Sequence, residues 1–216
     1  MTPNVKSKIK LSFLLLITIL PISLATFYFR SVFESGEIGV TRNKGTLINP
    51  PADISDLMMR DASGDTVFKS FEDVIATLGE EDEYTLRPWL MVYVTGETCN
   101  EECKERIYYM KQLHIALGKN IQRVRRYYLD ASSQGITPEL TTLFRNDYPS
   151  MGVAFSDKLL LEKNMKSKGV NLSLDSESYI LLVDPVGNVM MYYTKEQSAE
   201  DIKADLETLL KYSSLG

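Results

Sequence analysis

The sequence contains one histidine and two cysteines in 216 residues. A single histidine excludes most histidine-based hydrolytic sites, and the chain has no glycine-rich phosphate loop or zinc-protease motif. Its net charge is -5, and no long basic run with interleaved aromatic residues occurs. Because a nucleic-acid-binding protein needs such a basic footprint, that class of function is excluded.

The chain also lacks internal repeats and low-complexity tracts. Its hydrophobic fraction of 44% and charged fraction of 25% are ordinary for a globular protein, which excludes a disordered chain and a multispanning membrane protein. The length predicts one globular domain preceded by an N-terminal appendage.

The appendage is apolar and flanked by positive charge. Three lysines, Lys6, Lys8 and Lys10, precede an uncharged segment of 19 residues, 11–29. A helix of that length spans roughly 28 Å, close to the hydrocarbon thickness of a bilayer. We therefore predict a cytoplasmic leader over residues 1–10 and a transmembrane anchor over 11–29, with the following domain outside the cytoplasm.

A cleaved signal peptide is the alternative for this segment. Its apolar core is followed by Pro21 and then by Ser23-Leu24-Ala25, small residues at the spacing that a signal peptidase accepts. Both interpretations export the domain to an oxidising compartment, where a cysteine pair can form a disulfide.

The segment after the apolar run is rich in glycine and proline, and we predict an extended tether over residues 30–55 and a folded domain over 56–216. The domain begins with two short strand candidates, 57–60 and 66–68, around a turn at 61–65. A short helical segment is predicted from Phe71.

The middle of the domain has the pattern of a strand, a helix and a second strand. Trp89–Thr95 is a continuous apolar run that predicts a buried central strand. Residues 100–117 change to helical spacing, and a second strand is predicted over 123–129. This order indicates a parallel crossover unit, with the two cysteines at its first strand-to-helix turn.

The remainder predicts a short helix from Thr137 to Arg145, a hairpin of strands 179–183 and 188–193, and a final helix that begins near Ser198. Residues 148–178 give no clear prediction. A crossover unit followed by a hairpin and a terminal helix is the order of a thioredoxin-like α/β fold, a central mixed sheet flanked by helices.

Cys99 and Cys103 are the candidate site. At the start of a helix, free amide groups and the helix dipole stabilise a thiolate, which is the nucleophile of disulfide exchange and a soft ligand for Cu(I). The spacing of four lets the sulfurs form a disulfide or share one metal ion. The alternative is a merely structural disulfide, although so short a loop stabilises a fold little. Negative charge at Glu97, Glu101 and Glu102 disfavours the thiolate.

Other candidates have simpler explanations. His114 lies eleven residues beyond Cys103 on one helix, about 16 Å along its axis, so it cannot share a metal with the pair and is expected half-buried on a helix face. Adjacent Met190 and Met191 point to opposite faces of a strand, which favours one core and one surface residue. The basic stretch 123–126 is expected at an edge or on a solvated face.

The order of these motifs resembles the Sco/SenC family of membrane-anchored thioredoxin-fold proteins, which act in copper delivery or thiol chemistry during cytochrome c oxidase assembly. The similar features are the N-terminal anchor, the hairpin 57–68, the strand that leads into the cysteine pair and the segment 179–187 before the last helix. Residues 45–51 and 112–119 resemble a divergent membrane-anchored branch tied to oxidase assembly.

The resemblance implies that Cys99 and Cys103 are paired thiolate ligands for copper. The family's histidine ligand has no counterpart, because Ser176 stands nearest to its expected place, and a hydroxyl is a weak donor for copper. Two thiolates alone can hold Cu(I). The absence of the histidine ligand favours thiol reduction over copper delivery.

The implied function is that of an accessory factor for oxidase assembly. It would act on the bacterial inner membrane, through Cu(I) delivery or reduction of copper-site cysteines. Its partners would be the copper-containing oxidase subunit or other assembly factors. It would be metallochaperone-like or a thiol-disulfide oxidoreductase. The alternative is a scaffolding module with a structural disulfide.

Overall fold

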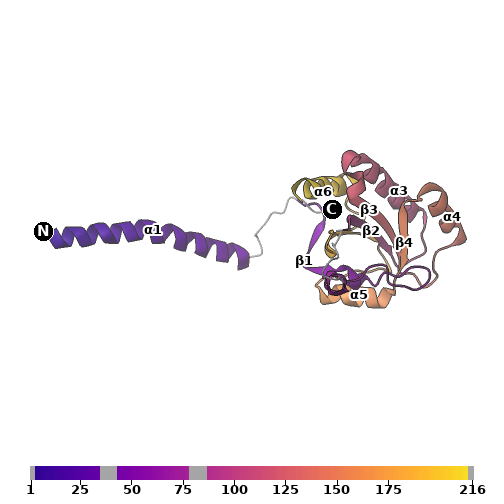
Figure 1. Cartoon of the computed structure of the whole chain (residues 1–216), viewed down its shortest axis with the longest axis horizontal. Coiled ribbons are helices and arrows are strands. Elements are labelled where there is room, and N and C mark those ends of the chain that lie inside the picture. Colours follow the sequence, from indigo (N-terminus) through magenta and orange to yellow (C-terminus); the bar gives the residue numbers. More distant parts are fainter. Residues whose placement is uncertain (1–2, 35–42, 78–86, 214–216) are drawn as a thin grey trace. The chain divides into compact units, whose positions relative to one another are not determined.

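The computed structural model describes residues 3–34, 43–77 and 87–213. The chain divides into two compact units, Met1–Arg42 and Asn43–Gly216 (Figure 1). The first unit contains one helix, α1 (Pro3–Glu34), of which Lys8–Tyr28 is long and apolar enough to cross a membrane. The helix is longer than the predicted anchor, because residues on both sides of 11–29 continue it.

The second unit is built on one mixed sheet of six strands in the order β1-β6-β5-β2-β3-β4. The pairs β2–β3 and β3–β4 are parallel, and the other three pairs are antiparallel. The strands are β1 (Thr46–Asp53), β2 (Trp89–Thr95), β3 (Val124–Asp130), β4 (Met151–Phe155), β5 (Tyr179–Val183) and β6 (Asn188–Tyr193). The predicted thioredoxin-like fold class is confirmed.

Helices cover both faces of this sheet (Figure 1). One apolar core lies beneath α3 (Glu101–Ala116), α4 (Pro138–Asp147) and α6 (Ala199–Tyr212). The other lies beneath α5 (Lys158–Ser167) and the 3-10 helix η1 (Ile54–Leu57). All seven residues of β2 are buried, which is the burial expected of a central strand with both faces covered.

The tether predicted for residues 30–55 is wrong over its C-terminal part. Thr46–Asp53 is an edge strand paired with β6, and the folded unit starts at Asn43. Pro50 and Pro51 suggested a linker, yet an edge strand tolerates proline because one side of its backbone needs no partner. The pairing is interrupted between Leu47 and Ala52, where the prolines lie. Residues 30–34 of the predicted tether belong to α1, and 35–42 lie outside the described residues.

The segment that gave no clear prediction contains β4 and α5. Gly152 in β4 lies against Tyr127, so close that an added Cβ would stand 2.3 Å from the ring. Asp157 caps α5 by accepting a hydrogen bond from the backbone N–H of Leu160 at 2.9 Å. Because β4 pairs outside β3, residues 124–126 of the basic stretch lie on an interior strand and the expected edge position is wrong. The expected solvated face holds for Arg125, which is exposed, but not for the buried Arg126.

The other predicted elements lie near their expected positions. The strand candidates 57–60 and 66–68 reduce to one bridge between Arg60 and Thr66, and Arg60 also bridges to Phe155 of β4. The helix predicted from Phe71 is α2 (Phe71–Thr77). The 3-10 helix η2 (Gly118–Arg123) connects α3 to β3.

Candidate functional site

The two cysteines form a disulfide at the turn between β2 and α3, and their Cα atoms are 5.2 Å apart. Asn100 caps the helix, and its side-chain oxygen accepts a hydrogen bond from the backbone N–H of Cys103 at 3.0 Å. Cys103 is therefore in the first turn of α3, whereas Cys99 precedes the cap. The expected position of the pair at the strand-to-helix turn is confirmed, but only one sulfur is carried by the helix.

The two sulfur-bearing residues differ in burial. Cys103 is 4% exposed and packs in the core beneath α3, while Cys99 is half-buried. An incoming thiol reaches Cys99 more easily than Cys103, since disulfide exchange requires direct approach to the attacked sulfur. This asymmetry gives Cys99 the geometry of an attacking residue and Cys103 that of a resolving residue.

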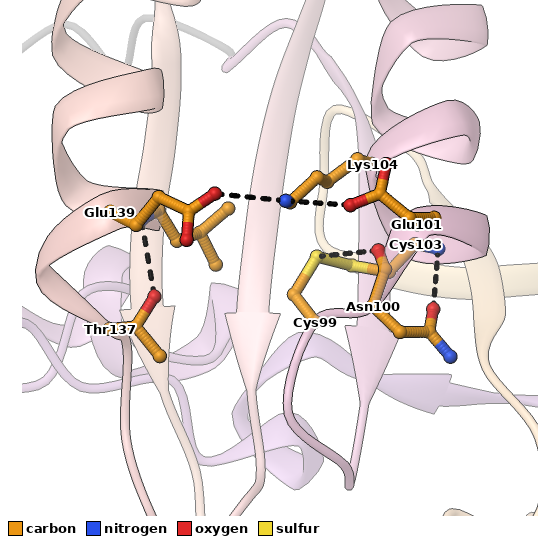
Figure 2. A network of polar contacts seen from close by, with 8 residues as sticks. Cys99, Asn100, Glu101, Cys103, Lys104, Thr137 and Glu139 are labelled. Carbon is orange, nitrogen blue, oxygen red and sulfur yellow. Dashed lines mark hydrogen bonds and ion pairs between the residues drawn. A yellow bond between two sulfur atoms is a disulfide. The ribbon is translucent and has the colours of Figure 1, made fainter.

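The charges around the disulfide are mostly negative. Glu97, Glu101 and Glu102 are exposed beside it, as the sequence indicated. One cation of α3, Lys104, is engaged by two carboxylates, Glu101 at 2.9 Å and Glu139 of α4 at 3.1 Å (Figure 2). Because this ammonium is neutralised by the two carboxylates, it adds little to the stabilisation of a thiolate by the helix N-terminus and its amide groups.

A small polar cavity of about 70 Å³ lies against Cys103. Tyr93 of β2 lines it, and its hydroxyl is hydrogen-bonded to Ser178. Burial raises the pKa of Tyr93, and that hydrogen bond and the charge of Arg106 oppose the rise. Tyr93 therefore remains a neutral hydroxyl beside Cys103.

Sequence reasoning placed Tyr93 only in a buried strand and did not assign it to the site. Its single signal was a polar atom in an otherwise apolar run. Only the fold brings Ser178 to it, from a loop far along the chain.

That loop is held at the site by close packing. At Gly96 an added Cβ would lie 2.5 Å from the carbonyl oxygen of Leu174, so only glycine permits the approach. Ser176 consequently lines the same cavity as Cys103. Ser176, the residue that stands nearest in sequence to the expected place of the family's histidine, therefore offers a hydroxyl to this cavity.

His114 does not join the site. Helix α3 is unbroken from Glu101 to Ala116, so His114 lies three turns from the disulfide. Its ring is half-buried, and Nε2 lies 2.9 Å from the carbonyl oxygen of Ile121 and 2.8 Å from that of Val124. Since both partners are acceptors, Nε2 carries the proton and donates to them. The prediction of a half-buried helix-face histidine is confirmed.

The donor set around the pair offers two sulfurs and only hard oxygen atoms. In the disulfide neither sulfur is a thiolate, so reduction must precede metal binding. Within residues 3–34, 43–77 and 87–213, no three His, Cys, Asp or Glu side chains are grouped to hold a metal ion. The reduced pair fits a two-coordinate Cu(I), which accepts soft thiolates, better than Cu(II).

The fold and the disulfide define a class, the thioredoxin-like proteins structurally similar to the Sco/SenC family. Arabidopsis thaliana ScoI with copper bound is 11% identical and has a TM-score of 0.51, over 76% of this chain and 98% of that one. Yeast Sco1 is 13% identical at 0.51, over 73% and 94% of the two chains. Yeast Sco1 with copper bound is 13% identical at 0.50, over 72% and 90%.

Residues 89–213, more than half of the chain, match the family described as the transmembrane-like, thioredoxin-like, C-terminal domain. The chain belongs to this family. No curated protein matches it significantly in sequence. The matched region contains the disulfide, the small polar cavity and the loop that carries Ser176.

Proposed function

We propose that this chain is a membrane-anchored accessory factor for respiratory cytochrome c oxidase assembly that works by thiol–disulfide exchange at Cys99 and Cys103. The observation that carries the proposal is the asymmetry of the pair, a half-buried Cys99 joined to a Cys103 that is 4% exposed. The Sco-like fold supplies the context, and the client is a disulfide between copper-site cysteines of an oxidase subunit.

The exchange balances as follows. The Cys99 thiolate attacks one sulfur of the client disulfide, which forms a mixed disulfide and releases one client thiolate. The Cys103 thiolate then attacks Cys99, which forms the Cys99–Cys103 disulfide and releases the second client thiolate. The client gains two electrons and this chain loses them, so a thiol reductant in the same compartment must regenerate the dithiol.

The proposed location is the bacterial inner membrane, with the domain in the periplasm. Helix α1 is long and apolar enough to span a bilayer, and the lysines that precede its apolar part favour a cytoplasmic N-terminus. Anchoring would hold the cysteine pair near a membrane-bound client. A signal peptidase would instead release the domain, so the size of the mature chain in cells separates the two outcomes.

Copper transfer by the reduced pair is the second candidate function. It is favoured by two sulfurs at one site with a Cα–Cα distance of 5.2 Å, and by the copper bound to the similar Arabidopsis and yeast proteins. Cu(I) would be cargo held by Cys99 and Cys103. Titration of the reduced chain with Cu(I) against a competing chelator tests this candidate, because equal uptake by the Cys99→Ser/Cys103→Ser variant excludes these ligands.

The exchange mechanism is tested by trapping. In cells, the Cys103→Ser variant cannot resolve a mixed disulfide, so a covalent complex with the client should accumulate and disappear on reduction. The Cys99→Ser variant is the matched control and should trap nothing. Oxidase activity should fall in both variants.

Wild-type oxidase assembly in the double serine variant, with the domain folded, would instead show a scaffold with a structural disulfide. A reduction potential of the Cys99–Cys103 pair above that of the client disulfide would also rule out the reductant role, because electrons flow from the couple of lower potential to the couple of higher potential.

A further inference from the structure

A second and larger cavity lies at the other end of α3. Its volume is about 820 Å³, and it is lined by the C-terminal half of α3, by η2, by the start of β3 and by residues 147–152. The disulfide follows the carboxyl end of β2, whereas this cavity borders the amino end of the parallel neighbour β3. The two cavities therefore occupy opposite ends of the sheet.

The charges that line this cavity are not balanced. Lys111, Arg125 and Arg126 are cations, and Asp147 is the one carboxylate among its lining residues. His114 also lines it, and burial lowers the pKa of its ring, with the charge of Arg126 adding to the effect. With the histidine neutral, the lining carries two net positive charges.

Arg126 is the least satisfied of these groups. Its residue is 4% exposed, and Nη2 donates a hydrogen bond to Ser150 Oγ at 2.7 Å. Nε and Nη1 are buried with no hydrogen-bond partner among the described residues, and no described carboxylate lies within ion-pairing distance of the guanidinium. Burial of a guanidinium without a counter-charge destabilises the folded state, and a bound anion would offset that destabilisation.

Among the described residues, no carboxylate forms an ion pair with the remaining cations either. Lys111 Nζ donates to the backbone carbonyl of Asp147 at 2.8 Å and lies 5.0 Å from the centre of the Tyr148 ring. Arg125 is exposed on the same lining. The ammonium group of Lys111 can therefore turn towards a ligand without breaking an ion pair. The side chain of Arg125 leaves β3 on the face opposite to that of Arg126, so this residue contributes positive charge only at the outer edge of the cavity.

We propose that this cavity binds a phosphate-type dianion, with Arg126 and Ser150 as the inner donors and Lys111 and Arg125 as the outer cations. The net charge of the lining matches a doubly charged phosphate group better than a single carboxylate. Planar guanidinium donors suit its tetrahedral oxygens. The group can belong to free inorganic phosphate or to the phosphomonoester headgroup of a lipid.

The test is calorimetric titration of the full chain in uncharged detergent micelles with inorganic phosphate at low ionic strength, where screening is weakest. Wild type should bind one phosphate per chain with a dissociation constant below about 1 mM. Arg126→Met should weaken binding at least about tenfold, and Lys111→Gln about threefold. Lys119→Gln removes an exposed charge that does not line the cavity, so it should bind like wild type.

The absence of saturable binding up to about 10 mM phosphate would overturn the proposal, as would equal affinity in wild type and Lys111→Gln. If Arg126→Met fails to fold, the phosphate affinity of Lys111→Gln relative to wild type still tests the proposal. A second titration compares phosphatidylcholine nanodiscs with and without phosphatidic acid. Phosphate affinity that falls in the presence of phosphatidic acid identifies a lipid headgroup, and unchanged affinity identifies free phosphate.

Discussion

The two ends of α3 differ in how their charges are satisfied. At the N-terminal end, the cation Lys104 is matched by two carboxylates, Glu101 and Glu139 (Figure 2). At the C-terminal end, Lys111 and the buried Arg126 face a cavity with no carboxylate paired to either among the described residues. One helix thus joins an acidic site that holds a disulfide to a basic site whose cations no described carboxylate pairs.

The difference shows that the burial of an uncharged side chain and the burial of a charged one have different consequences, because only the charged one needs a partner of opposite charge. The buried group at the N-terminal end, Cys103, is uncharged and bonded to Cys99, so its burial needs no counter-charge. The buried group at the C-terminal end is the cation Arg126, which no carboxylate among the described residues pairs, and this is the observation on which the proposed anion site rests. Each of the following experiments changes one side of this comparison.

The largest expected effect is on the free energy of unfolding, when a paired and an unpaired buried charge, Asp205 and Arg126, are each removed. Asp205 of α6 is 4% exposed, and its carboxylate accepts hydrogen bonds from the backbone N–H groups of Lys44 and Gly45, both 2.9 Å from Oδ2, and from Tyr193 Oη at 3.2 Å. Asp205→Ala should lower the free energy of unfolding by about 2–3 kcal/mol, because three donors lose a charged acceptor.

Arg126→Met in phosphate-free buffer should leave stability unchanged or raise it by about 1 kcal/mol, because it removes an uncompensated charge. Urea unfolding followed by the fluorescence of Trp89, the one tryptophan, reports on the folded domain in both variants. A loss of stability in Arg126→Met as large as that in Asp205→Ala would show that the guanidinium is already satisfied.

The next effect concerns the two sulfurs. After mild reduction, N-ethylmaleimide should label Cys99 at least about tenfold faster than Cys103, since one residue is half-buried and the other 4% exposed. Mass spectrometry of peptides sampled over time measures both rates in one experiment. Equal rates would remove the basis for assigning attacking and resolving roles.

A smaller effect is expected at His114. Burial lowers the pKa of this ring below its ordinary 6.5, so the unfolded chain binds the proton more readily than the folded chain. The stability that this group contributes is complete above about pH 7 and is lost as the pH falls through 6.5. The loss should be below about 1 kcal/mol because the ring is half-exposed.

The control for this effect is His114→Gln, which can still donate to the carbonyl oxygens of Ile121 and Val124. Urea midpoints of wild type and variant should converge as the pH decreases from 7.5 to 5. If the two curves stay parallel at all pH values, the pKa of His114 does not differ between the folded and unfolded chain.

The smallest effect is electrostatic tuning of the disulfide site. Glu102→Gln removes one negative charge from the lining of the cavity beside Cys103 and should favour the thiolate of the reduced pair. Alkylation of Cys99 at pH 7 should become about twofold faster. Glu196→Gln, an exposed carboxylate outside that cavity, is the charge-matched control and should change the rate less.

Local patterns predicted most of the elements. The apolar run Trp89–Thr95, the helical spacing over residues 100–117 and the helix start near Ser198 each specify an element within a few residues, and each lies where the sequence placed it. The failures involve long-range pairing. Pro50 and Pro51 indicate a linker until β6 is known to pair with the strand, and β4 is short and holds a glycine that only the packing of Tyr127 explains.

The sequence by itself determined the apolar N-terminal helix, the thioredoxin-like order of elements and the place of Cys99 and Cys103 at a strand-to-helix turn, because these depend on neighbours within one or two turns of chain. Only the tertiary structure decided which sulfur is buried, that Ser176 reaches the cysteine site, and that Arg126 lies on an interior strand with no described carboxylate paired to it. These properties depend on segments far apart in the chain, whose contacts exist only once the sheet has formed.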